Sequence, residues 1–219
     1  MLLRARHVGP IETVFTDLGG VLLTNGWDRR ARERAAEVFH LEAEEMMERH
    51  HLTFDTYETG KLDLETYLDR IVFYEPRPFS REEFAQFMFA QSKPYSDALD
   101  FFRALGACDG FRLAAISNEG RELAEYRIEK FRLYEFLRVF VISSFVHFRK
   151  PDEDIYRLAL DIAHARPETS AYVEDRLMFA TVAHGLGFNA IHHTDLASTR
   201  AALAELGVAP PPEAMRRAA

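Results

Sequence analysis

The sequence predicts a doubly wound α/β fold, a parallel sheet with helices on both faces, and an α-helical cap inserted after the first strand. Two observations favour this fold. Short apolar runs alternate with helical segments from residue 96 onward, which is typical of right-handed βαβ units with parallel strands. Residues 25–95 show helical periodicity and no strand pattern. We therefore predict a core of residues 1–24 and 96–219 and a helical cap of residues 25–95.

The predicted elements follow one another in a simple order. Residues 14–16 form the first strand, and cap helices follow over 29 to about 50, within 63–74 and within 80–92. In the core we expect strands over 112–118, 138–144, 170–175 and 189–193. Helices are expected between them and at the end, over 96–105, 121–131, 155–163 and 196–206, with one more between the last two strands.

Composition limits the class of protein. The 219 residues include 47% hydrophobic residues, and 27 basic against 35 acidic side chains give a formal net charge of −8. This balance argues against nucleic-acid or anionic-membrane binding, which uses basic patches. The first ten residues, MLLRARHVGP, have no apolar h-region, so we do not expect a signal peptide. No apolar run approaches the roughly 18 residues that span a bilayer. The single Cys108 excludes an intrachain disulfide and suits a reducing compartment. We expect a soluble cytoplasmic protein, and the oligomeric state is left open.

Polar side chains follow the first strand and three later ones. Asp17 ends the first strand, Ser117 the second, Lys150 follows the third, and Glu174 and Asp175 end the fourth. Ligands of open α/β sheets bind at the carboxyl ends of the strands. Carboxylates with open positions suit Mg²⁺, and an ammonium and a hydroxyl suit phosphate oxygens. Each feature alone also fits a turn or a helix cap, but together they indicate a site for Mg²⁺ and phosphate.

These segments resemble the four motifs of the haloacid dehalogenase-like hydrolases. The matching segments are FTDLGGVLL around Asp17, AISNE around Ser117, RKPD around Lys150 and VED at 173–175. The resemblance covers nearly the whole chain, and residues 25–95 fall where that family inserts a helical cap. It implies the Rossmann-like core that the family shares.

The resemblance also implies roles for these residues. The Asp17 carboxylate would attack phosphorus and form an aspartyl-phosphate. Ser117 would hydrogen-bond the transferred phosphoryl group, and Lys150 would pair with that group and with Asp17. The substrate phosphate would also contact the turn residues Asn118, Gly19 and Gly20.

A Mg²⁺ site is implied by the same resemblance. Asp17, Asp175 and the carbonyl oxygen of Gly19 would bind the ion, with Glu174 as a further candidate ligand. The metal would stabilise the charged transition state.

Two positions depart from the family's pattern. Its phosphatases usually carry a second aspartate, the general acid and base, two residues after the nucleophile, where this chain has Gly19. The last motif usually has Asp or Asn four residues after the metal-binding aspartate, where this chain has Phe179. A replacement proton donor could come from Glu119, Glu174 or His51. A leaving group that is stable as an anion needs no donor, so we expect sugar 1-phosphates or acyl phosphates to react faster than alkyl phosphates.

The first expectation is a Mg²⁺-dependent phosphatase of a small phosphorylated metabolite. A 2-haloacid dehalogenase is the first alternative, since it uses the same aspartate on carbon and needs no metal. The pair Glu174 and Asp175 favours the metal-dependent enzyme. A catalytically silent ligand-binding relative is the second alternative, and Gly19 and Phe179 favour it.

Residues near the cap are secondary candidates for substrate selection, namely Asn25, Trp27, His51 and Tyr57. Neighbouring side chains on a helix or strand point apart. The histidine pairs at 50–51 and 192–193 therefore do not indicate a metal site.

Overall fold

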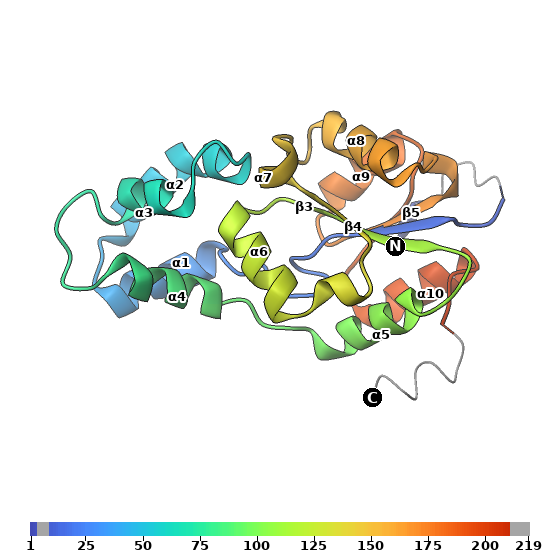
Figure 1. Cartoon of the computed structure of the whole chain (residues 1–219), viewed down its shortest axis with the longest axis horizontal. Coiled ribbons are helices and arrows are strands. Elements are labelled where there is room, and N and C mark those ends of the chain that lie inside the picture. The colour runs from blue at the N-terminus through green and yellow to red at the C-terminus, as the bar shows by residue number, and fades with distance from the viewer. Residues whose placement is uncertain (4–8, 211–219) are drawn as a thin grey trace.

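The computed structural model describes residues 1–3 and 9–210, so parts of the predicted core, 4–8 and 211–219, lie outside the described residues. A six-stranded sheet forms the centre of the molecule, in the order β1-β6-β5-β2-β3-β4 (Figure 1). The strands are β1 (Leu2–Leu3), β2 (Thr13–Thr16), β3 (Arg112–Ser117), β4 (Val139–Ile142), β5 (Ser170–Glu174) and β6 (Asn189–His192).

The sheet is doubly wound, as predicted. The chain runs from β2 to β3 and β4 on one side, and then crosses back so that β5 and β6 lie on the other side of β2. These five strands are parallel. The carboxyl end of β2 is therefore the topological switch point, where such sheets bind ligands. Only β1 is antiparallel, to β6, and its two residues were not predicted because they are too few to show a pattern.

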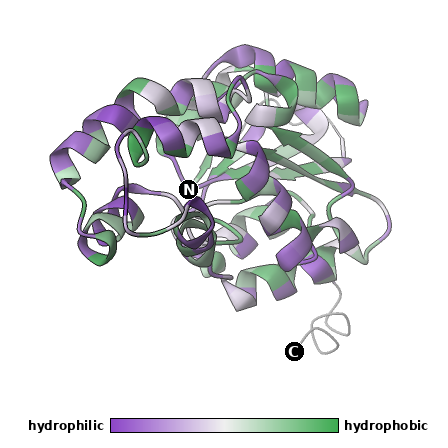
Figure 2. Ribbon diagram, turned by 60° about the vertical axis from the view of Figure 1, so that its left-hand side comes forward, coloured by the Kyte–Doolittle hydropathy of each residue, from purple (hydrophilic) through white to green (hydrophobic). Residues whose placement is uncertain are grey.

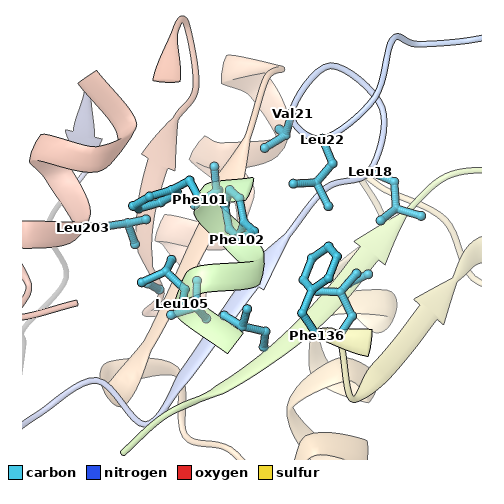
Figure 3. Packing of buried hydrophobic residues seen from close by; sticks show 14 of the residues in the cluster. Leu18, Val21, Leu22, Phe101, Phe102, Leu105, Phe136 and Leu203 are labelled. Carbon is cyan, nitrogen blue, oxygen red and sulfur yellow. The ribbon is translucent and has the colours of Figure 1, made fainter. Parts of the chain in front are cut away.

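Helices cover both faces of the sheet. Along β2, Val14 belongs to one buried cluster and the next residue, Phe15, to the cluster on the opposite face, since successive strand side chains alternate. The first cluster includes residues of α5 (Ser96–Gly106), α6 (Arg121–Lys130) and α10 (Leu196–Glu205), and Figure 3 shows its packing. The second includes residues of α8 (Glu153–Ala163) and α9 (Leu177–Gly185).

Residues 25–95 are largely helical, as predicted. The helices α1 (Arg29–Phe39), α2 (Ala43–Glu58), α3 (Leu64–Ile71) and α4 (Arg81–Ala90) lie beside the sheet at one end of the molecule (Figure 1). They enclose a further hydrophobic cluster around the aromatic rings of Trp27, Tyr67 and Phe84, which Leu123 of α6 also joins. The chain enters and leaves this helical part through two segments, one at Thr24 and one at Lys93. The segments lie side by side, since the backbone N–H of Thr24 donates to the Lys93 carbonyl at 2.9 Å.

One predicted helix is in fact two. The helix expected over 29 to about 50 is interrupted at His40, which adopts a left-handed backbone with φ of 52° and caps α1. Glycine is the usual residue in that conformation, so the sequence carried no signal for the break. The strand expected over 138–144 ends at Ile142 because α7 (Ser143–Val146) begins there.

The short 3-10 helices η1 (Leu133–Glu135) and η2 (Pro167–Thr169) complete the fold. Figure 2 shows largely hydrophobic central strands and helices that alternate hydrophobic and hydrophilic residues. Among the helices of the described residues, none has both the length and the apolar character needed to span a membrane.

The packing of α5 against the sheet predicts a large stability loss on truncation of its core ring. Phe102 is fully buried, and Phe102→Ala is expected to lower the free energy of unfolding by about 3–5 kcal/mol. Urea unfolding measures this loss. The matched control is Phe148→Ala, because Phe148 is 39% exposed and its loss should change stability by roughly 0.5 kcal/mol or less. Equal losses in both variants would contradict this packing.

Candidate active site

The predicted polar residues meet at the carboxyl edge of the sheet. Asp17 follows β2, Ser117 ends β3, and Glu174 and Asp175 stand at the end of β5. Lys150 reaches them from the loop between α7 and α8. Four elements far apart in the sequence therefore bring two hydrogen-bonding groups and three carboxylates into one place.

Lys150 is the centre of this cluster. Its side chain has no exposed surface, and Nζ lies 3.0 Å from Asp17 Oδ2 and 2.7 Å from Glu174 Oε2. It also donates to the Ile116 carbonyl and the Tyr172 hydroxyl, both at 3.1 Å. Burial lowers the pKa of Lys150, but the charges of Asp17 and Glu174 outweigh burial and raise it. The side chain therefore stays a cation.

Asn118 fixes the backbone of Lys150. Its side-chain amide donates to the Lys150 carbonyl and its oxygen accepts from the Lys150 N–H, both at 2.8 Å. The Asn118 side chain thus positions the lysine from β3's end of the sheet. Because the Asn118 side chain is engaged in this way, the backbone of Asn118 remains for the phosphate contact expected from the sequence.

Asp17 is a buried carboxylate held by two kinds of contact. Its Oδ1 accepts from the backbone N–H of Leu18 at 2.8 Å, and its side chain is 10% exposed. Burial raises the pKa of Asp17 from 3.8 to about 6, partly offset by the charge of Lys150. Above about pH 6 this carboxylate is ionised and can act as a nucleophile.

The acidic groups form a cluster with the size of a metal site. One oxygen each from Asp17, Glu174 and Asp175 lie within 4.8 Å of one another. Both oxygens of Glu174 are engaged, Oε2 with Lys150 and Tyr172, and Oε1 with the backbone N–H of Arg176. Its carboxylate is therefore less available to an ion than the other two.

Asp175 is the carboxylate that fits an ion best. Within the described residues, its Oδ1 is buried and has no hydrogen-bond partner, which is costly unless a ligand satisfies it. Gly20 has φ of 73°, and a Cβ there would stand 2.1 Å from Asp175 Oδ2. Only glycine lets the chain pass this close to the carboxylate. The unpartnered Asp175 oxygen, with the Asp17 carboxylate close to it, suits Mg²⁺.

A cavity of about 600 Å³ opens over Asp17, between the sheet edge and the cap helices. Gly19, Ser117, Asn118 and Lys150 also line it. All four secondary candidates contribute to its wall, namely Asn25, Trp27, His51 and Tyr57. Gly20 and Asp175 line a neighbouring cavity instead.

Phe179 also borders the cavity. Its ring lies 5.3 Å from the Lys150 ammonium, which it helps to cover. The position where the family usually has an aspartate or asparagine is thus an apolar wall beside the lysine.

The buried residue Arg127 was not predicted from the sequence. Its side chain on α6 is 1% exposed and lies 2.6 Å from Glu119 Oε1. It also donates to Ser92 Oγ at 2.9 Å and to the Thr24 carbonyl at 3.1 Å. A single arginine within a helical pattern is most often solvent-exposed, so nothing in the sequence marked this one.

A hydrogen-bonded chain in the cap ends at the cavity wall. Trp27 Nε1 donates to the Tyr67 hydroxyl at 2.9 Å, and that hydroxyl lies 2.7 Å from His50 Nδ1. Burial lowers the pKa of His50 to about 3, with further contributions from Arg32 and His51. The neutral ring therefore accepts at Nδ1, and His50 acts as a wall residue.

Comparison with known proteins gives a family and a fold. A family model described as haloacid dehalogenase-like hydrolase matches residues 11–187. A HAD family enzyme from Bacteroides thetaiotaomicron, solved in complex with magnesium and inorganic phosphate, is similar in structure with a TM-score of 0.70. It is 19% identical, and the match covers 83% of this chain and 93% of that chain.

Two further structures show the same fold. A predicted HAD-like family hydrolase from Porphyromonas gingivalis is 18% identical, with a TM-score of 0.66 over 84% of this chain and 91% of that one. The L-2-haloacid dehalogenase from Xanthobacter autotrophicus, with chloropropionic acid covalently bound, is 16% identical, with a TM-score of 0.59 over 95% and 87%. A search of the curated proteins found no match.

The low pKa of His50 predicts a pH-dependent stability term. Its folded pKa of about 3 lies below the unfolded value of 6.5, so the unfolded chain binds the proton first and stability falls as pH drops below 6.5. At about pH 5 the loss from this residue is roughly 2 kcal/mol relative to about pH 7.

Urea unfolding at both pH values compares the wild type with His50→Gln, whose side-chain oxygen still accepts from Tyr67. The variant should lose less stability than the wild type on acidification. An identical loss in both proteins would show that His50 does not contribute.

Proposed function

This chain belongs to the haloacid dehalogenase-like hydrolases, and we propose that it is a Mg²⁺-dependent phosphatase of a small phosphorylated metabolite. The observation that carries the proposal is the buried Asp17 carboxylate, 3.0 Å from the Lys150 ammonium and beside an Asp175 oxygen without a partner. Such a site offers a nucleophile, a fixed cation and room for a metal on one side of the cavity.

In the proposed reaction an Asp17 oxygen attacks phosphorus, the bond from phosphorus to the leaving oxygen breaks, and an aspartyl-phosphate forms. Lys150 and the Ser117 hydroxyl hold the charged phosphoryl oxygens, and the backbone at Asn118 and Gly19 adds N–H groups. The contact expected from Gly20 is not part of this proposal, because the Gly20 N–H donates to the Leu23 carbonyl at 2.7 Å and Gly20 lines the neighbouring cavity. Preorganised charges of this kind stabilise the transition state more than the ground state. Water then attacks phosphorus and releases phosphate and the free Asp17 carboxylate.

Mg²⁺ would be held by Asp17, Asp175 and the carbonyl oxygen of Gly19, and when bound it would neutralise charge on the phosphoryl group. Glu174 contributes negative charge next to the site while it anchors Lys150. The magnesium and phosphate in the Bacteroides thetaiotaomicron structure support this proposal.

Residues 25–95 act in this proposal as a cap that selects the substrate, over a core of residues 1–24 and 96–219. Support comes from the contacts between the two parts, since Arg149 Nη2 lies 2.7 Å from Glu58 Oε2 on α2 and Arg149 also pairs with Asp55. The cavity of about 600 Å³ has the size for a small metabolite. The single Cys108, which is free, supports a cytoplasmic location.

Dehalogenase activity is the second candidate, and the aromatic wall of the cavity favours it. Trp27, Phe54 and Phe179 could surround a carbon–halogen bond, and a haloacid dehalogenase shares the fold. Phosphate and halide release, each measured with Mg²⁺ and with a chelator, distinguishes the two activities. Halide release without a metal would favour the dehalogenase. If neither phosphate nor halide is released, a catalytically silent ligand-binding protein is favoured.

The proposed nucleophile predicts the effect of Asp17→Asn. The amide keeps the shape of the carboxylate but cannot form an aspartyl-phosphate, so phosphate release should fall by roughly 10³-fold or more. The fold should survive, because Lys150 keeps Glu174 as a charged partner at 2.7 Å and the amide oxygen of Asn can still accept from it. Exposed Asp161→Asn is the matched control and should keep wild-type activity. Near wild-type rates in the Asp17 variant would rule out the covalent mechanism.

The proposed metal site predicts stabilisation by Mg²⁺. A ligand that binds only the folded state at about 100 times its dissociation constant adds about 2.7 kcal/mol, which raises the melting temperature by several degrees. Melting curves with and without Mg²⁺ measure the shift.

Asp175→Asn should remove this response, whereas exposed Asp109→Asn should keep it. A wild-type melting temperature that does not move with Mg²⁺ would argue against the metal site.

A further inference from the structure

The site lacks a carboxyl group at position 19, and the structure discriminates among the three replacements considered from the sequence. Glu174 has both oxygens engaged and is fully buried under Lys150. His51 lines the cavity from the cap, but it is solvent-exposed. Glu119 lines the same cavity and is 4% exposed. It is the remaining candidate.

Glu119 has one engaged oxygen and one free oxygen. Its Oε1 accepts from Arg127 Nη1 at 2.6 Å and from Ser117 Oγ at 3.2 Å. Within the described residues, its Oε2 is buried and has no hydrogen-bond partner. Its backbone N–H donates to Ser143 Oγ at 3.0 Å, which fixes the turn that carries it. An unpartnered carboxylate oxygen on a cavity wall is costly unless a ligand or water meets it.

The guanidinium of Arg127, which holds Glu119, lies on the side where a residue 19 side chain would point. A Cβ built on Gly19 would stand 3.8 Å from Arg127 Nη1, the atom that holds Glu119 Oε1. The same Cβ would stand 2.9 Å from Asn25 Oδ1. The region that the missing aspartate would occupy is thus bordered by Asn25 and by Arg127, the partner of Glu119.

We infer that Glu119 replaces the missing aspartate as the general acid and base of this site, with Arg127 as its positioning residue. This inference rests on the proposed phosphatase function. When Asp17 attacks phosphorus, the proton on Glu119 Oε2 passes to the leaving oxygen, and the alcohol departs. When water attacks the aspartyl-phosphate, Glu119 takes a proton from that water, which restores the acid for the next turnover.

The surroundings of Glu119 suit proton exchange. Burial raises its pKa, the charge of Arg127 partly offsets burial, and the charge of Asp17 raises the pKa further. A carboxyl group with a raised pKa works as an acid and a base closer to neutral pH than an exposed one.

Glu119 changes the substrate preference expected from Gly19 alone. With a proton donor present, alkyl phosphates need no especially stable leaving group, so the wild-type rate should depend only weakly on leaving-group pKa. The steep dependence expected from the sequence should appear when the Glu119 proton is removed.

The test is kcat/KM for a series of aryl and alkyl phosphates, with Mg²⁺, in the wild type and in Glu119→Gln. The amide oxygen of Gln still accepts from Arg127 and Ser117, so the fold should be kept, as melting curves check. Alkyl phosphate turnover should fall by about 10²–10⁴-fold, the usual worth of a general acid. The most activated aryl phosphates should lose far less.

Three further variants make the test specific. Glu125→Gln removes an exposed carboxylate on α6, the helix that carries Arg127, and should behave as the wild type. Glu119→Asp keeps a carboxyl group but places it farther from the leaving oxygen. The dependence of kcat/KM on leaving-group pKa should then be intermediate in steepness, and this test remains available even if the Gln variant unfolds. Gly19→Asp added to Glu119→Gln should restore alkyl phosphate turnover, because only the distal oxygen of Asn25 must move.

A second readout separates catalysis from structure. In the Glu119→Gln variant, Asp17 can still accept a phosphoryl group from an activated aryl phosphate, because that leaving group needs no proton. The variant lacks the base that activates water, so hydrolysis of the aspartyl-phosphate should be slow. Intact-mass spectrometry after rapid quenching should therefore show a larger phosphorylated fraction of the chain in the variant than in the wild type.

The outcomes distinguish the role of Glu119 from the phosphatase function on which it rests. A uniform loss across the series in Glu119→Gln, without phosphoenzyme, would overturn the role of Glu119 and leave the phosphatase intact. A steep leaving-group dependence in the wild type would do the same. A wild type that hydrolyses no phosphate ester would overturn both.

Discussion

The buried ammonium of Lys150 is the constraint on which the site depends. A cation without exposed surface needs charged and hydrogen-bonding partners, and this one has Asp17, Glu174, the Ile116 carbonyl and the Tyr172 hydroxyl. Removing one partner of a buried pair typically costs about 3–5 kcal/mol, because the other charge stays buried. Glu174 is thereby committed to the lysine. Asp17 and Asp175 remain the carboxylates that can meet a substrate or a metal.

The winding of the sheet and the position of the cap bring the remaining groups to this lysine. Because β2 lies between β3 and β5, the residues that end these strands become neighbours of Asp17. The cap approaches the core closely at two glycines. A Cβ on Gly26 would stand 1.8 Å from Arg127 Nη2, and one on Gly120 would stand 2.0 Å from the Tyr57 ring. Glycine at these two positions leaves room for Arg127 and Tyr57, which both line the cavity over Asp17.

The sequence predicted the parts of the fold and site that follow from local patterns. Asp17, Ser117 and Lys150 were found because each follows an apolar strand, and topology brings the ends of such strands together. The break at His40 escaped because a left-handed residue other than glycine has no sequence signature. Arg127 and the hydrogen-bonded pair of His50 and Tyr67 escaped because their burial depends on residues far along the chain.

The central claim is that Asp17 attacks phosphorus, and the mass of its peptide during turnover tests this claim most directly. The reaction is run with a phosphate ester and Mg²⁺ in water labelled with heavy oxygen, quenched in acid, and the peptide that contains Asp17 is analysed by mass spectrometry. The account predicts a phosphoryl group on Asp17 and heavy oxygen in the released phosphate. Phosphate release with Asp17 never phosphorylated would contradict it, as would heavy oxygen in the Asp17 carboxylate, which is the result of attack on carbon.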